Sequence, residues 1–149
     1  MISAEAVKKL REETGASMIE CKKALEEAQG DEAKAKEILG KLGAAMAQKK
    51  AQRQTNSGLV VSYIHGNQKI GVLMSLYCET DFVARNENFK ALANDLCLQV
   101  AAANPAGNEE LLAQPFIKDP AKTVQGLLNE TIGKLGENIK LGKFTRFEI

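Results

Sequence analysis

Residues 70–89 read IGVLMSLYCETDFVARNENF, and this stretch decides how the second part of the chain folds. Its first eight residues are mostly apolar, which predicts a buried strand. A polar, charged segment follows directly, and a helical pattern begins at residue 88. Phe82 lies inside the polar segment, so its ring either folds back into the core or points outward as a contact residue. The stretch therefore predicts a strand, a turn and a helix in succession.

A second strand precedes this one and is expected to pair with it. Residues 59–64 are rich in β-branched and aromatic side chains, and residues 65–68 read HGNQ, a turn sequence. The two strands therefore predict a hairpin. The helix expected over residues 88–103 has one apolar face, made by Phe89, Leu92, Leu96 and Val100.

The C-terminal part predicts a helix and then a strand. Asp119–Pro120 favours a helix start, because an acid caps a helix well and proline fits its first position. An apolar stripe over Val124–Leu135 continues that helix. Residues 139–149 predict a final strand with a bulge at Gly142, where the alternation breaks. The second part of the chain is therefore expected to be a small antiparallel sheet covered by helices.

The first part of the chain is helical throughout. Ser3 can cap a first helix, which Gly15 ends. Ser17 and Glu20 match a capping box, in which the serine and the glutamate each accept a backbone N–H of the other. Asp31 can cap a third helix. Three short helices in succession predict a small bundle.

The change of period near residue 55 divides the chain. We expect residues 1–55 to form a three-helix domain that ends in a basic linker helix, and residues 56–149 to form the core domain. The expected fold class is α+β.

Composition excludes several kinds of protein. The chain has 149 residues and a formal net charge of +1, so no strong global field favours nucleic acid or an anionic membrane. No apolar run is long enough to span a bilayer, and we expect no contact with a membrane. The three cysteines are far apart, which is typical of reduced thiols rather than a disulfide framework.

The sequence also lacks the usual patterns of enzyme sites. It has no phosphate-binding glycine motif and no dinucleotide fingerprint. A single histidine, His65, cannot build a histidine-rich metal site, and no cysteine cluster has ligand spacing. Cys21 falls on the apolar face of the second helix, where core packing is the usual role. We therefore expect a binding protein with no catalytic residues, metal or cofactor.

Five segments resemble the elongation factor Ts family. Residues 10–25 are similar to its N-terminal signature, and residues 78–84 contain the Thr-Asp-Phe-Val motif. Residues 62–73, together with residues 114–116 and 136–139, are similar to its core. The segments occur in the order of the family and cover nearly the whole chain, so the resemblance is specific.

The resemblance implies a function and a set of contact residues. Family members are guanine-nucleotide exchange factors that bind elongation factor Tu–GDP, disturb its Mg²⁺ and phosphate site, and promote GDP release. Their three-helix unit resembles a ubiquitin-associated domain and docks on the GTPase, and an aromatic wedge enters between two of its helices. Carried onto this chain, the implied contacts are Thr80, Asp81, Phe82 and Val83 in the core, Arg11, Met18, Ile19 and Lys22 near the N-terminus, and His65.

Several of these residues also have an ordinary structural interpretation. A phenylalanine between a strand and a helix usually packs in the core. Met18 and Ile19 are adjacent, so they cannot both lie at the centre of one helix face, and we expect one in the core and one exposed. His65 in a turn is most often a plain polar turn residue. Lys22 is typical of a solvated helix face.

The chain departs from the family pattern in length. Many members are longer, with a duplicated core, whereas one copy is found here, which leads us to expect a homodimer. The stretch between Asn104 and Gln114 is also unusually brief, as if a helical segment were missing. The resemblance implies a cytoplasmic bacterial protein or one of an organellar matrix.

Two alternatives from other classes remain at this stage. The chain could be an adaptor that joins a ubiquitin-associated-like module to an unrelated core. It could also bind RNA or the ribosome through residues 38–78, which contain no acid. The lack of tryptophan and of an aromatic stacking platform argues against RNA. Salt dependence separates these classes, because nucleic-acid binding weakens steeply with salt.

Overall fold

Three helices form the N-terminal part of the computed structural model, which describes residues 1–149. They are α1 (Ala4–Thr14), α2 (Met18–Glu27) and α3 (Glu32–Lys50). Each begins at a predicted cap: Ser3, Ser17 and Asp31 accept hydrogen bonds from backbone N–H groups of their first turns. A small hydrophobic core joins them, built from Val7, Leu10, Cys21, Ala24, Leu25, Ala28 and Ala35.

Helix α3 is longer than an isolated bundle needs, and it packs at both ends. Its first half carries Ala35 into the N-terminal core, and Ala47 in its second half packs against the main core. The helix runs through Gly43, whose missing side chain lets the backbone of α7 at Asn129 approach closely. Leu42 points away from both cores and is exposed.

A three-stranded antiparallel sheet forms the rest of the framework. Its strands are β1 (Ser57–Ile64), β2 (Ile70–Cys78) and β5 (Ile139–Glu148), with β2 in the centre. The register of β2 and β5 shifts between Met74 and Leu76. This is the bulge expected at Gly142, and Lys143 donates its N–H to the Ser75 hydroxyl there at 3.0 Å.

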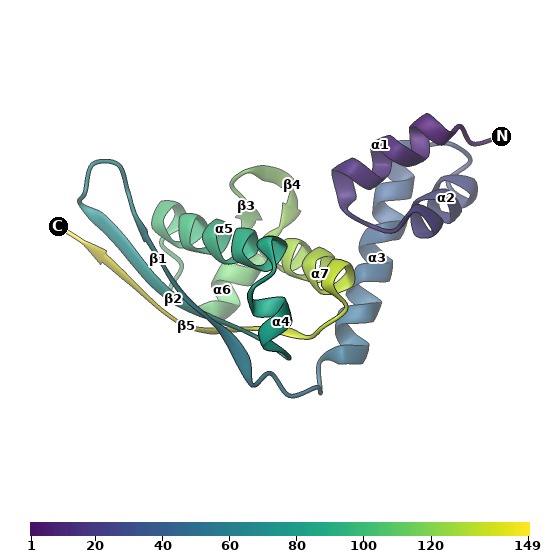
Figure 1. The fold of residues 1–149 in the computed structure, drawn as a ribbon. Helices are drawn as coiled ribbons and strands as arrows, with labels where there is room; N and C mark the ends of the chain where they lie inside the picture. Colours follow the sequence, from purple (N-terminus) through teal and green to yellow (C-terminus); the bar gives the residue numbers. More distant parts are fainter.

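Helices cover one face of the sheet (Figure 1). These are α4 (Asp81–Ala84), α5 (Glu87–Ala103), α6 (Asn108–Ala113) and α7 (Val124–Leu135). The predicted face of α5 is buried, and Phe89, Leu92, Leu96 and Val100 enter the main core with Leu128 and Ile132 of α7. The other face of the sheet has no cover, and Val60, Leu73, Tyr77 and Phe147 are exposed on its strands. The expected α+β fold class is confirmed.

One predicted boundary is wrong. Asp119–Pro120 does not start a helix, because Asp119–Thr123 forms strand β4, which pairs with β3 (Pro115–Phe116). The buried Gln99 of α5 decides this: its amide accepts from Ile117 N at 2.9 Å and donates to the carbonyl of Pro115 at 3.1 Å. The next helix starts later, at Val124, with Thr123 as its cap. Proline is tolerated in β4 because that strand lies at a sheet edge.

None of the helices combines the length and the apolar character needed to cross a bilayer. All three cysteines are buried and free.

Candidate functional site

The Phe82 side chain stands on a single helical turn and points away from the protein. It is 84% exposed, whereas the next residue, Val83, is 5% exposed and belongs to the main core. Successive residues of a helix differ by about 100° in direction, so burial of Val83 and Ala84 turns Phe82 outward. Thr80 caps the turn by accepting the Val83 N–H at 3.3 Å. Of the two orientations open from the sequence, the structure has the outward one.

A carboxylate from a distant segment holds the start of this turn. Glu137 Oε1 accepts the backbone N–H groups of Glu79 and Thr80 at 3.1 and 3.0 Å. Its Oε2 accepts the Thr80 hydroxyl proton at 2.7 Å. Glu137 follows Gly136, which ends α7 with a φ of 74°, a left-handed conformation suited to glycine. The end of α7 therefore fixes the entry to α4.

A second set of contacts runs in the opposite direction. Glu79 Oε2 accepts the backbone N–H of Asn138 at 2.6 Å and lies 3.6 Å from Arg53 Nη1. The buried Asn138 side chain donates to the Arg53 carbonyl at 2.9 Å. Because Arg53 follows α3, these bonds tie three segments together: the end of the N-terminal helices, the turn before α4 and the loop after α7. The bond that the Glu79 carboxylate accepts is charge-assisted, and such bonds are the stronger ones in proteins.

The cysteine beside the turn has a structural role. Cys78 is fully buried, and its thiol donates to the Thr80 carbonyl at 3.2 Å. Burial, with a smaller effect of the nearby Glu137 carboxylate, raises the pKa of Cys78 to about 11. Burial likewise raises the pKa of Cys97 to about 11. Both thiols are therefore neutral at physiological pH, which argues against a nucleophilic role.

The N-terminal candidate residues lie on α1 and α2. Met18 and Ile19 are 47% and 69% exposed, so the expectation that one of them is in the core is wrong. Both occupy the first turn of α2, where side chains lean back past the helix end, while Cys21 and Leu25 one and two turns later fill the core. Lys22 is exposed and lies 3.9 Å from Glu26. Two apolar side chains thus face solvent at one helix start.

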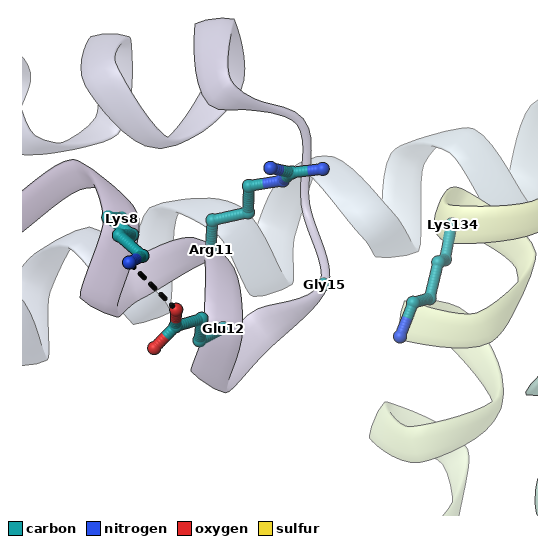
Figure 2. A pocket seen from close by; sticks show the side chains of 5 residues that line it. All are labelled: Lys8, Arg11, Glu12, Gly15 and Lys134. Atoms are coloured by element: carbon teal, nitrogen blue, oxygen red, sulfur yellow. Dashed lines mark ion pairs between the residues drawn. The ribbon is translucent and has the colours of Figure 1, made fainter.

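Arg11 borders a hollow between the N-terminal helices and α7, shown in Figure 2. The cavity has a volume of about 300 Å³ and is lined by Lys8, Arg11, Glu12, Gly15 and Lys134. Lys8 and Glu12 lie 3.9 Å apart, and the Lys134 side chain reaches from α7 toward Gly15. Three cationic groups and one acid line this hollow, so it is positively charged.

His65 lies in the turn between β1 and β2, and its Nδ1 is 3.0 Å from the Tyr63 hydroxyl. This turn, α4 and the pair α1 and α2 occupy three separate regions of the molecule (Figure 1). The structure brings Thr80, Asp81, Phe82 and Val83 together on one turn but leaves the other candidates apart from it. No group of three His, Cys, Asp or Glu side chains is placed to hold a metal ion.

Sequence patterns alone indicate no role for Glu137, Asn138 and Arg53. Residues 136–139 resemble a family motif, but that resemblance does not predict a contact with the turn at residue 79. The only local signal is a pair of polar residues directly after a helix-ending glycine. The hydrogen bonds themselves join positions 57 to 87 residues apart.

Comparison with known proteins identifies the family. A family model described as elongation factor TS matches residues 79–149. The elongation factor Ts of Oleidesulfovibrio alaskensis is 44% identical over 193 aligned positions, covering 99% of this chain and 98% of the relative. That of Thermoanaerobacter sp. is 46% identical, covering 99% and 95%, and that of Thermotoga maritima is 44% identical, covering 99% and 96%.

The alignment also measures how short this chain is. With 193 aligned positions and 149 residues, at least 44 positions of the alignment are gaps in this chain. The agreement extends over both parts of the chain, which favours an exchange factor over the adaptor and the RNA-binding alternatives. The chain belongs to the elongation factor Ts family, the guanine-nucleotide exchange factors of elongation factor Tu, which perform no covalent chemistry.

Proposed function

We propose that Phe82 is the side chain with which this exchange factor opens the GTPase domain of elongation factor Tu. The observation that carries the proposal is an aromatic ring 84% exposed on a turn that is capped by Thr80 and held by Glu137. Because the turn that carries the ring is held in place, its backbone loses little conformational entropy when the ring enters a partner, which favours binding. Asp81, the exposed residue beside it, is the polar contact.

Thr80 and Val83 support this turn rather than meeting the partner directly. The Thr80 hydroxyl is already bonded to Glu137 and to the Val83 N–H. Val83 was among the implied contacts, but its side chain is buried and leaves little surface for a partner. We assign both residues an anchoring role.

One aromatic ring is not enough for nucleotide release. A strong hot-spot residue contributes roughly 2–4 kcal/mol, whereas a nanomolar nucleotide complex amounts to roughly 12 kcal/mol. A second contact surface is therefore required. The exposed Met18 and Ile19, with Arg11 and Lys22 nearby in the chain, supply an apolar patch edged by cations. His65, on the separate β1–β2 turn, would be a third contact.

We propose two domains, residues 1–55 and residues 56–149, which are connected through α3. The separate hydrophobic cores favour the division, and the bonds of Arg53 and Asn138 link the two parts close to the proposed boundary.

The binding of the exchange factor and the binding of the nucleotide to elongation factor Tu are reciprocally coupled. Entry of GTP therefore also weakens the affinity of the exchange factor for elongation factor Tu.

We also propose that the protein works as a homodimer through the open face of its sheet. Val60, Leu73, Tyr77 and Phe147 are 42–73% exposed there, and no helix of the chain covers them. An apolar patch of this kind on a monomer usually marks an interface. We favour a second copy as the occupant, because a twofold axis brings the same patch of both copies together, so that one apolar face covers the other.

The gap in the alignment is proposed to lie between α5 and β3. Only the short helix α6 connects these elements, and the sequence is brief between Asn104 and Gln114. The relatives named above are bacterial, which supports a site of action in bacterial cytoplasm.

Release of a fluorescent GDP analogue from elongation factor Tu, followed by stopped flow, tests the proposal. We expect Phe82→Ala to remove most of the acceleration. Leu42→Ala is the matched control, since Leu42 is also an exposed apolar residue but lies outside the proposed contacts. Equal acceleration by wild type and Phe82→Ala would exclude Phe82 as the wedge.

A further inference from the structure

We propose that Glu137 is a positioning residue for Phe82, which it controls through Thr80 without touching the partner. This inference rests on the proposed function of Phe82 as the wedge. It assigns a role in exchange to a carboxylate that lies 55 positions from the wedge in the sequence.

Helix α4 is too short to fix its own direction. The helix has four residues, Asp81–Ala84, and a single helical turn is not stable by itself in water. Its direction must therefore be fixed from outside. Burial of Val83 and Ala84 fixes one side of the turn, but it gives no partner to the backbone N–H groups of Glu79 and Thr80 at the start of the turn.

Glu137 fixes the start of this turn, at Glu79 and Thr80. Its two oxygens accept three hydrogen bonds, from Glu79 N, Thr80 N and Thr80 Oγ1, at 2.7 to 3.1 Å. Thr80 Oγ1 in turn accepts the Val83 N–H, so the position of Thr80 also fixes the orientation of α4. The carboxylate, the capping hydroxyl and the first turn form one continuous chain of bonds that ends beside Phe82.

The support for Glu137 is itself anchored. The next residue, Asn138, is buried, donates its backbone N–H to Glu79 at 2.6 Å and donates its side chain to the Arg53 carbonyl. The loop after α7 and the turn before α4 thus hold each other reciprocally. Because Arg53 directly follows the N-terminal helices, this loop also links the wedge to the part of the chain that carries the second contact surface.

The bonding of Glu137 separates positioning from direct contact. Both of its oxygens are directed at groups of this chain, so its charge is engaged within the protein. A glutamine can reproduce most of the geometry, because its carbonyl can accept the two backbone N–H groups and its amide can donate to Thr80 Oγ1. An alanine can reproduce none of it.

The experiment is a double-mutant cycle measured as kcat/KM for GDP release. We expect Glu137→Ala to lower kcat/KM by roughly tenfold to a hundredfold, as misplacement of a working group by about 1 Å does in enzymes. Glu137→Gln is expected to stay within about threefold of wild type. In the Phe82→Ala background, Glu137→Ala is expected to have no further effect, because the group that it positions is gone.

Amide hydrogen exchange supplies a second readout. In Glu137→Ala the N–H groups of Thr80 and Val83 should exchange faster, while those of α5 and β2 should remain protected. If Glu137→Ala does not fold, Thr80→Val replaces it in the cycle, since it removes the bonded hydroxyl and keeps a similar shape. Its effect should likewise disappear in the Phe82→Ala background.

The outcomes are distinct. If Glu137→Ala lowers kcat/KM by the same factor with and without Phe82, or leaves it unchanged, the positioning role is overturned while the wedge stands. If Glu137→Gln is as impaired as Glu137→Ala, the charge of Glu137 matters directly and positioning is again overturned. If Phe82→Ala alone has no effect, the proposed function fails, and the positioning role fails with it.

Discussion

Phe82 and Val83 are adjacent in the chain but have opposite environments: Phe82 is 84% exposed, and Val83 is 5% exposed in the main core. A residue free for function therefore lies next to the one that anchors it. This pairing allows binding and stability to be tested separately at neighbouring positions.

Substitution of the two residues should affect stability very differently. Val83→Ala removes two buried methyl groups and should lower the free energy of unfolding by about 2 kcal/mol. Phe82→Ala should change it by less than about 0.5 kcal/mol, because an exposed side chain contributes little. Urea denaturation of both variants measures this. A comparable loss of stability in Phe82→Ala would mean that the ring packs on its own protein.

The bulge at Gly142 should be intolerant of any side chain. A Cβ on Gly142 would overlap the Ser75 hydroxyl and lie 2.6 Å from Tyr77 Cε2. We expect Gly142→Ala to lower the free energy of unfolding by about 1–3 kcal/mol, the usual cost of overpacking. Gly66→Ala is the control, since a Cβ there meets nothing within 4 Å. Thermal unfolding should separate the variants; equal melting temperatures would contradict the bulge geometry.

The open sheet face gives a prediction about assembly. Leu73→Lys places a charge in the middle of that face and should convert a dimer into a monomer of 16.1 kDa, because burying an unpaired charge in an interface is costly. Leu42→Lys, at a similarly exposed position on α3, should leave the dimer intact. Sedimentation velocity gives the mass directly. A monomeric wild-type protein at micromolar concentration would refute the homodimer.

The buried cysteines make stability depend on alkaline pH. The pKa of Cys97 is raised to about 11 from the ordinary 9.0, so the folded protein keeps a neutral thiol where the unfolded chain ionises. The resulting stability is complete below pH 9 and is lost as the pH rises through about 11. Cys78 follows the same sign with its pKa also near 11.

We therefore expect the urea midpoint of wild type to fall between pH 9 and pH 11 more steeply than that of Cys97→Ala. The alanine variant loses packing at every pH, so its midpoint is lower throughout, but it lacks one of the ionising thiols. Parallel pH profiles for the two proteins would argue against a titrating Cys97.

Local patterns gave correct predictions wherever the deciding bond joins near neighbours. The caps at Ser3, Ser17 and Asp31 hold because each side chain meets a backbone N–H three residues away. The hairpin before Cys78 and the apolar face of α5 follow from periods of two and of 3.6 residues. The same patterns failed at Asp119, which they predicted as a helix start. The distant, buried Gln99 accepts the Ile117 N–H and favours a strand there instead.

By itself, the sequence determined the α+β class, the order of most elements, the family likeness and the absence of any catalytic motif. Only the tertiary structure decided that Phe82 points outward, that Met18 and Ile19 are both exposed, and that Glu137 holds the wedge turn. The reason is physical: a local cap or period is written in a few adjacent residues. Exposure, by contrast, depends on which distant side chains fill the core, and the Glu137 bonds join segments that meet only when the chain folds.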